Sequence, residues 1–229
     1  MDLTQQKIIN LLKTKSSTKQ QIYRTTLEVF KEFKNQLMQL SNTLTTEMLA
    51  FDSNVEIKYS DNGQFESHFK FSGDTLVIMM HTNVFSFPEN HILKNSKYIK
   101  EDPMREFCGL IQVYNFLSDS IKYNREMDMG ELLARVYINK DNHFFIEGRR
   151  PLSIMHNNLA TDVITPEVTK KIIEEAVMYC INYDLVTPPF EMVKNITVEQ
   201  KNYMSYSSGF ATAKSVGFEL KNQFNSESK

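Results

Sequence analysis

Charged and aromatic side chains alternate in residues 135–150, and side chains of these kinds could bind and process an anionic ligand. Arg135 and Arg149 could hold a carboxylate or phosphate group, because a guanidinium donates paired hydrogen bonds to either. His143 or Glu147 could then move a proton. The candidate ligand-binding residues are Arg135, Tyr137, His143, Phe145, Glu147, Arg149 and Arg150. The competing interpretation is a face that a helix covers, or an ordinary ion-pair face in solvent.

The alternation itself predicts a β-hairpin. Residues 132–139 and 143–149 would be its strands, joined by a three-residue loop at 140–142. Opposite charges that face each other across such a ladder stabilise it by about 0.2–1 kcal/mol. The tetrapeptide IEGR at 146–149, which resembles a protease site used in fusion linkers, is therefore predicted to be a strand end. The predicted cross-strand pairs are Val136–Ile146, Ile138–Phe144, Arg135–Glu147, Tyr137–Phe145 and Asn139–His143.

Motifs for other chemistry are missing from the sequence. The two cysteines, Cys108 and Cys180, lie far apart and form no metal-ligand spacing. The chain contains no phosphate-binding loop, nucleophile elbow or dinucleotide fingerprint. We therefore expect no metal and no cofactor, assign no catalytic residue, and expect a binding protein rather than an enzyme. Five histidines occur singly, none in a metal-binding pattern: His68, His81, His91, His143 and His156.

The first fifty residues are predicted to be helical. Ser16-Ser17-Thr18 interrupts the pattern, and Thr18 with Gln21 resembles a capping box that would open a second, longer helix. Two arrangements remain open for its apolar stripe. The helix could lie on a sheet, or it could form a coiled-coil seam between two subunits. The stripe comprises Leu27, Phe30, Phe33, Leu37, Leu40, Leu44 and Met48. The predicted subunit interface is Phe30, Phe33, Leu37, Leu40 and Leu44.

From Val55 onward the apolar period changes to two, which predicts strands. A first hairpin would turn at Asp61-Asn62-Gly63, with Gly63 in a left-handed conformation. Residues 75–80 are apolar on both faces and predict a central strand. Residues 103–123 fit either a helix or a strand, and strand formers favour the second. The predicted pairs of the first hairpin are Tyr59–Phe65 and Ile57–Ser67.

The last third is predicted to be helical. Thr165 followed by Pro166 is typical of a helix start, and Pro188-Pro189 of a break. A last helix would begin at Thr197, with Gln200 completing a capping box. The predicted buried stripe is Ile172, Ile173, Ala176, Val177, Cys180 and Ile181. A stripe of small residues suited to close helix packing is Ser205, Gly209, Ala213 and Gly217.

Together these elements predict an α+β fold, with a mostly antiparallel sheet of about five strands and a long N-terminal helix and C-terminal helices packed on it. The 229 residues are expected to form one domain, with segments at 1–50, 54–150 and 165–224. The formal charge of −2 gives no electrostatic reason to expect nucleic acid. No apolar run is long enough for a signal peptide or a membrane span, so a cytoplasmic protein is expected.

The predicted order of elements is a helix, three strands, an intervening segment, two strands and a helix. This order resembles that of the type III secretion chaperones and their relatives. The resemblance is one of fold alone and carries no function. From the missing catalytic motifs and the long amphipathic helix we expect a non-enzymatic protein-binding or assembly protein, chaperone- or adaptor-like, that forms a homodimer and binds a protein or peptide. The alternative is a small anionic-ligand-binding protein or enzyme that uses the face of Arg135, Glu147, Arg149 and His143.

Overall fold

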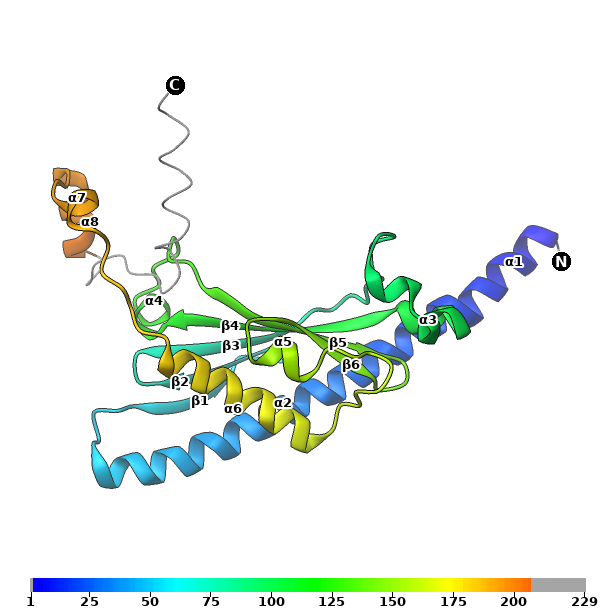
Figure 1. The fold of residues 1–229 in the computed structure, drawn as a ribbon, viewed down its shortest axis with the longest axis horizontal. Coiled ribbons are helices and arrows are strands. Elements are labelled where there is room, and N and C mark those ends of the chain that lie inside the picture. Colours follow the sequence, from blue (N-terminus) through cyan, green and yellow to red (C-terminus); the bar gives the residue numbers. More distant parts are fainter. Residues whose placement is uncertain (1, 207–229) are drawn as a thin grey trace.

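A single antiparallel sheet of six strands organises the computed structural model, which describes residues 2–206. Each strand pairs with its neighbours in sequence, in the order β1-β2-β3-β4-β5-β6 (Figure 1). The fold class is therefore α+β as predicted, with six strands rather than about five. The strands are β1 (Ile57–Asp61), β2 (Glu66–Phe71), β3 (Asp74–Met80), β4 (Cys108–Leu117), β5 (Glu131–Asn139) and β6 (Phe144–Gly148).

Two helices cover one face of the sheet, which we call the helix face (Figure 1). They are α2 (Ser17–Phe51) and α6 (Pro166–Asn182), and they also pack against each other. The main core lies between these helices and the strands, because alternate strand residues point toward them. Its largest fully buried side chains include Phe30, Phe33, Leu37, Phe69, Leu76, Ile78, Ile111, Leu133, Ile138 and Phe144.

The opposite, outer face of the sheet is partly covered by the segment between β3 and β4. This segment contains the short helices η2 (Ile92–Asn95), α3 (Lys97–Glu101) and η3 (Pro103–Glu106). Its apolar side chains form a second, smaller core over the outer face. That core comprises Phe87, Ile99, Cys108, Phe145 and Leu159, with Leu93, Tyr98 and Tyr137 partly buried against it.

The N-terminal helix does not break where the sequence predicted. Helix α1 (Leu3–Leu11) continues through a π turn, η1 (Leu12–Ser16), directly into α2. Thr18 therefore lies inside a continuous helix, and the predicted capping box there is wrong. The stretch contains no glycine or proline, and a π turn absorbs the irregularity without ending the helix.

The first hairpin has a different register from the predicted one. Tyr59 pairs with Phe69 rather than Phe65, and Ile57 pairs with Phe71. A shift by an even number of residues keeps every side chain on the same face, so the alternation could not select between the registers. The wider loop lets Phe65 pack against the main core. Gly63 adopts a φ of +99°, and its predicted left-handed conformation is confirmed.

Other predicted elements are confirmed. Residues 108–117 form the strand β4, which lies between β3 and β5 in the sheet. Thr165 caps α6 by accepting a hydrogen bond from the Val168 amide at 3.3 Å. Thr197 and Gln200 form their capping box at the start of α8 (Val198–Tyr206). In the second hairpin, all predicted pairs that lie within the strands are observed.

Some C-terminal predictions differ or lie outside the description. Ile181, assigned to the buried stripe of α6, is 62% exposed in the last turn of that helix, so this part of the prediction is wrong. The stripe of Ser205, Gly209, Ala213 and Gly217 lies outside the side chains that the structure describes. The remaining short helices are α4 (Ser118–Lys122), α5 (Leu152–Met155) and α7 (Phe190–Val193). Among the described residues, no helix has the length and apolar character to cross a membrane.

Candidate functional site

Four of the predicted site residues lie together on the outer face of the second hairpin. The guanidinium of Arg135 is 2.5 Å from the carboxylate of Glu147, its partner across the ladder. The hydroxyl of Tyr137 donates to the same carboxylate at 3.2 Å, and its ring stacks on Phe145 with centroids 4.7 Å apart. Arg135 and Glu147 therefore neutralise each other, and an anionic ligand would have to compete with the carboxylate.

Aromatic rings of the segment between β3 and β4 pack on the outer face of this hairpin. Phe87 lies 5.5 Å from Phe145 and stacks on His91 at 4.8 Å, centroid to centroid. Burial, with a smaller contribution from the neighbouring Glu147, raises the pKa of Tyr137 to about 12. The phenol is therefore neutral at physiological pH and acts here as a hydrogen-bond donor.

The arginines at the end of β6 lie elsewhere. Arg149 pairs with the buried Glu131 at 2.7 Å, and Tyr179 of α6 donates to the same carboxylate at 3.4 Å. This contact places the Arg149 guanidinium on the helix face, whereas Arg135 lies on the outer face. The two arginines cannot clamp one anion together. Arg150 is exposed next to them.

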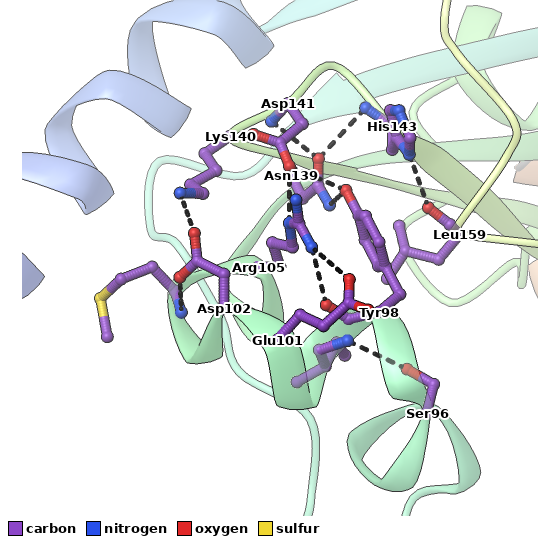
Figure 2. A network of polar contacts seen from close by, with 12 residues as sticks. Ser96, Tyr98, Glu101, Asp102, Arg105, Asn139, Lys140, Asp141, His143 and Leu159 are labelled. Carbon is purple, nitrogen blue, oxygen red and sulfur yellow. Dashed lines mark hydrogen bonds and ion pairs between the residues drawn. The ribbon is translucent and has the colours of Figure 1, made fainter.

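The turn of the second hairpin is the centre of a polar network (Figure 2). The side-chain oxygen of Asn139 accepts from the backbone amides of Asp141 and His143, at 2.9 and 3.1 Å. The Asn139 amide nitrogen donates to the hydroxyl of Tyr98 at 3.0 Å, and that hydroxyl donates to the Asp141 carboxylate at 3.0 Å. Asn139 is fully buried, so its own hydrogen bonds satisfy polar groups that water cannot reach.

Arg105 and His143 enclose the ring of Tyr98 within this network (Figure 2). The guanidinium of Arg105 lies 4.3 Å from the Tyr98 ring centroid and 2.9 Å from the Asp141 carboxylate. His143 stacks on the same ring at 5.2 Å, and its Nδ1 is 3.0 Å from the carbonyl oxygen of Leu159. His143, a candidate proton carrier from sequence, is therefore held inside the network.

The surroundings of the network keep the Asp102 carboxylate charged and the Tyr98 phenol neutral at physiological pH. Lys140 forms an ion pair with Asp102, and this contact is the main reason that the pKa of Asp102 lies below its usual range. Burial, opposed by Asn139 and assisted by Asp141, raises the pKa of Tyr98 to about 12. Through Tyr98, the network therefore connects the segment between β3 and β4 to the turn of the second hairpin.

We expect Tyr98→Phe to destabilise the protein by about 1–3 kcal/mol, since the buried amide of Asn139 would lose its acceptor. Urea denaturation followed by circular dichroism measures the loss. The matched control is Tyr123→Phe, because that tyrosine is 41% exposed. Equal stabilities for the two variants would contradict the role assigned to Tyr98.

His156 is expected to make stability depend on pH. Its ring packs 5.0 Å from that of Phe144, and burial, the largest cause, lowers the pKa of His156 below 6.5. The unfolded chain therefore binds more protons as the pH falls through about 6.5, and the free energy of unfolding decreases. Carboxylates such as Asp102, whose pKa values are lowered, titrate below this range.

Urea unfolding of wild type and His156→Gln at about pH 7.5 and about pH 5.5 measures this effect. The wild type should lose more stability than the variant as the pH falls, since only the wild type holds a neutral imidazole at this partly buried position. The other four histidines are present in both proteins. A loss of the same size in both would contradict the assignment to His156.

The residues predicted to form a subunit interface belong mainly to the core of one chain. Phe30, Phe33 and Leu37 are fully buried against the sheet. Leu40 and Leu44 are partly buried. Leu40 also lines a groove of about 170 Å³ between α2 and α6, together with Ile173, Gln36, Gln39, Thr43, Lys170 and Glu174. The stripe therefore lies on the sheet, and a subunit contact of α2 would have to use other side chains.

Exposed apolar side chains gather on residues 183–199, which we call the C-terminal arm. Seven large apolar side chains of the arm are between 43% and 85% exposed. Its helix α7 stands away from the sheet (Figure 1). These residues are Leu185, Val186, Phe190, Met192, Val193, Ile196 and Val198.

Sequence reasoning missed Tyr98, Asn139 and Arg105 as members of the polar network. The polar turn at 140–142 was visible, but no local pattern connects it to residues some forty positions earlier. Within residues 2–206, no cluster of three or more histidine, cysteine or acidic side chains is arranged to hold a metal ion.

No family model matches the chain, and no curated protein or solved structure shows significant similarity to it. The resemblance to the type III secretion chaperones in the order of elements stays a prediction, and the observed order differs from the predicted one by an additional strand.

Proposed function

We propose that this chain is a non-enzymatic protein-binding or assembly protein, chaperone- or adaptor-like, whose C-terminal arm contacts a protein or peptide partner. The exposure of seven large apolar side chains on one short segment supports this role. Soluble proteins rarely leave contiguous apolar surface in water, and such patches mark sites that another molecule covers. Phe190, at 75% exposure, is the natural anchor, since aromatic side chains dominate binding energy at interfaces.

The anionic-ligand alternative has less support. Its two arginines lie on opposite faces of the sheet, and each already contacts a carboxylate, Glu147 for Arg135 and Glu131 for Arg149. Its histidine stacks on Tyr98 and is held by the Leu159 carbonyl. A ligand at this face would have to replace several contacts that the chain makes with itself.

The proposal includes a homodimer in the cytoplasm, without nucleic acid, membrane, metal or cofactor. The small net charge supports the exclusion of nucleic acid. Both cysteines are buried, and burial raises the pKa of the Cys108 thiol, as suits a protein kept in a reducing compartment. The homodimer is suggested by the long helix α2, whose side away from the sheet is exposed.

A photoactivatable phenylalanine analogue placed at position 190 tests the proposed role in the cells that make the protein. We expect irradiation to join the intact chain covalently to another protein, identified by mass spectrometry of the adduct. The matched control places the same analogue at Lys97, a side chain 92% exposed on α3. Adducts at 190 but not at 97 support the proposal. Position 190 without protein adducts would overturn it.

A further inference from the structure

The two edges of the sheet differ in how their backbone groups are satisfied. At the β6 edge, the amide of Phe144 donates to the carbonyl oxygen of Asp162 at 2.9 Å, and that of Ile146 to the carbonyl oxygen of His156 at 2.7 Å. Residues 156–163 therefore close this edge. At the other edge, no backbone segment within residues 2–206 pairs with the outer side of β1.

The register of β1 decides which of its backbone groups point away from the sheet. The amides of Ser72 and Asn62 donate across the ladder to the carbonyl oxygens of Glu56 and Glu66, at 2.9 and 3.2 Å. Hydrogen-bonded pairs alternate with non-bonded pairs in an antiparallel ladder, so every second residue of β1 turns its N–H and C=O groups outward. These residues are Ile57, Tyr59 and Asp61.

Two of these three residues leave their backbone groups unpaired. The hydroxyl of Thr45 on α2 donates to the Ile57 carbonyl oxygen at 3.5 Å. The N–H and C=O groups of Tyr59 and Asp61 have no hydrogen-bond partner among the described residues. Outward groups on a strand repeat about every 7 Å, and a second extended backbone presents its own groups at the same spacing. Strand addition to a sheet edge satisfies both sets of groups.

Helix α2 runs along this edge and supplies an exposed apolar side chain beside it (Figure 1). Lys34 contacts the Asp61 carboxylate at 2.6 Å, and Thr45 contacts Ile57. Met38 follows Lys34 by four residues and precedes Thr45 by seven, so the three share one flank of the helix. Met38 therefore lies beside the middle of β1, and it is 45% exposed. An apolar side chain of an added strand could pack against it.

The outer side of this edge carries excess positive charge. Lys58 is exposed and lies opposite Lys70 across the ladder. The pKa of Glu56 is lowered, first by its hydrogen bond to Lys70 and further by the charges of Lys58 and Lys122. Three lysines therefore surround one carboxylate, and Lys58 forms no ion pair within residues 2–206. An acidic side chain on a neighbouring strand would complement this charge.

We propose that the β1 edge binds an extended segment of a partner protein, which adds a strand to the sheet. The segment alternates apolar and acidic side chains. Its apolar side chains contact Met38 and Tyr59 on the helix face, and an acidic one lies beside Lys58 on the outer face. The inference rests on the proposed binding of a protein or peptide and gives that partner an extended conformation.

The same observations argue against other occupants. A second copy paired through this edge would bring its own lysines to the same side of the sheet, and like charges across a ladder are destabilising. A free phosphate or carboxylate would meet Lys58 but would leave the backbone groups of Tyr59 and Asp61 unpaired. An acidic, extended segment satisfies the charge and the backbone together.

Photo-cross-linking finds the segment in the cells that make the protein. A photoactivatable phenylalanine analogue in place of Met38 should join the intact chain to another protein, and mass spectrometry of the digested adduct identifies the attached segment. The control position is Lys97, a side chain 92% exposed on α3. A segment without acidic and apolar alternation, a second copy of this chain, or no adduct at position 38 would overturn the proposal.

A synthetic peptide with the sequence of the attached segment then tests strand addition, by fluorescence anisotropy with the full-length protein. Tyr59→Pro removes an outward N–H without breaking a bond of the ladder, and proline is tolerated at sheet edges. We expect it to raise the Kd about tenfold, as for one lost hydrogen bond. The matched variant Tyr59→Val loses the ring but keeps the N–H, and should stay within about twofold of wild type. Equal affinities of the two variants would contradict strand addition.

Charge reversal tests the edge without touching the backbone. Lys58→Glu should raise the Kd of the same peptide about fivefold, as expected for an exposed pair that becomes repulsive. Lys97→Glu makes the same change of charge on α3 and should leave the Kd unchanged. Circular dichroism checks that each variant is folded. If Lys58→Glu and Lys97→Glu bind the peptide equally well, the orientation proposed for the acidic side chain is wrong.

The edge site and the role of the C-terminal arm can fail separately. Protein adducts at position 190 without adducts at position 38 would overturn the edge site and leave the proposed function standing. The reverse result would overturn the contact proposed for the C-terminal arm and leave the edge site.

Discussion

Replacing Leu37 with aspartate should unfold the chain rather than release folded monomers. The side chain is fully buried between α2 and the sheet, among Phe33 and Phe69. Losing its packing costs about 2–5 kcal/mol, and a buried carboxylate without a partner adds to that. The sum is comparable with the whole stability of an ordinary domain, about 5–15 kcal/mol. Circular dichroism and urea denaturation of the purified variant measure the effect.

The neighbouring residue supplies the control. Met38 lies on the outward side of the same helix and is 45% exposed, so Met38→Asp should leave the fold intact. The comparison separates the two roles considered for the apolar stripe. A folded, monomeric Leu37→Asp variant would mean that Leu37 joins two subunits, and would contradict its placement in the core.

The second large effect is expected at Gly109, where α2 crosses β4. A Cβ atom added to Gly109 would stand 1.9 Å from the Thr26 hydroxyl oxygen and 2.8 Å from the Thr26 Cβ. Thr26 is fully buried and cannot turn aside, so Gly109→Ala must push the helix away from the strand. We expect a loss of about 2–3 kcal/mol, as for overpacked cores, measured by urea denaturation.

Two further variants make this expectation specific. Gly73→Ala is the control, because nothing lies within 4 Å of the added atom there. Thr26→Gly removes the obstructing side chain, and its combination with Gly109→Ala should cost less than the sum of the two single losses. Strict additivity would show that the close approach of α2 to β4 is not the cause.

Local alternation was sufficient to determine the second hairpin. In residues 132–149, an apolar face, a charged pair and a polar three-residue turn agree on one register, and that register is observed. The first hairpin offered no such agreement, since a shift by four residues keeps Ile57 and Tyr59 on the core face. Only the tertiary structure distinguishes the two registers, by pairing Tyr59 with Phe69 and Ile57 with Phe71.

The candidate site was predictable only where its residues share one strand pair. Arg135, Tyr137 and Glu147 meet because the ladder brings them together. The turn network depends instead on Tyr98 and Arg105, which lie on the short helices α3 and η3, far away in sequence. Nothing in the spacing of those residues could reveal the contact, because these short helices are placed by tertiary packing and not by a repeating period.

The sequence by itself determined the fold class and the apolar stripe of the long helix, because periodicity and composition are local properties of the chain. It could not determine what covers that stripe, since a sheet and a second helix both bury an apolar face. The tertiary structure decided this in favour of the sheet, by placing Phe30, Phe33 and Leu37 in the core. It thereby left the outward side of α2 and the end at α1 available for a partner.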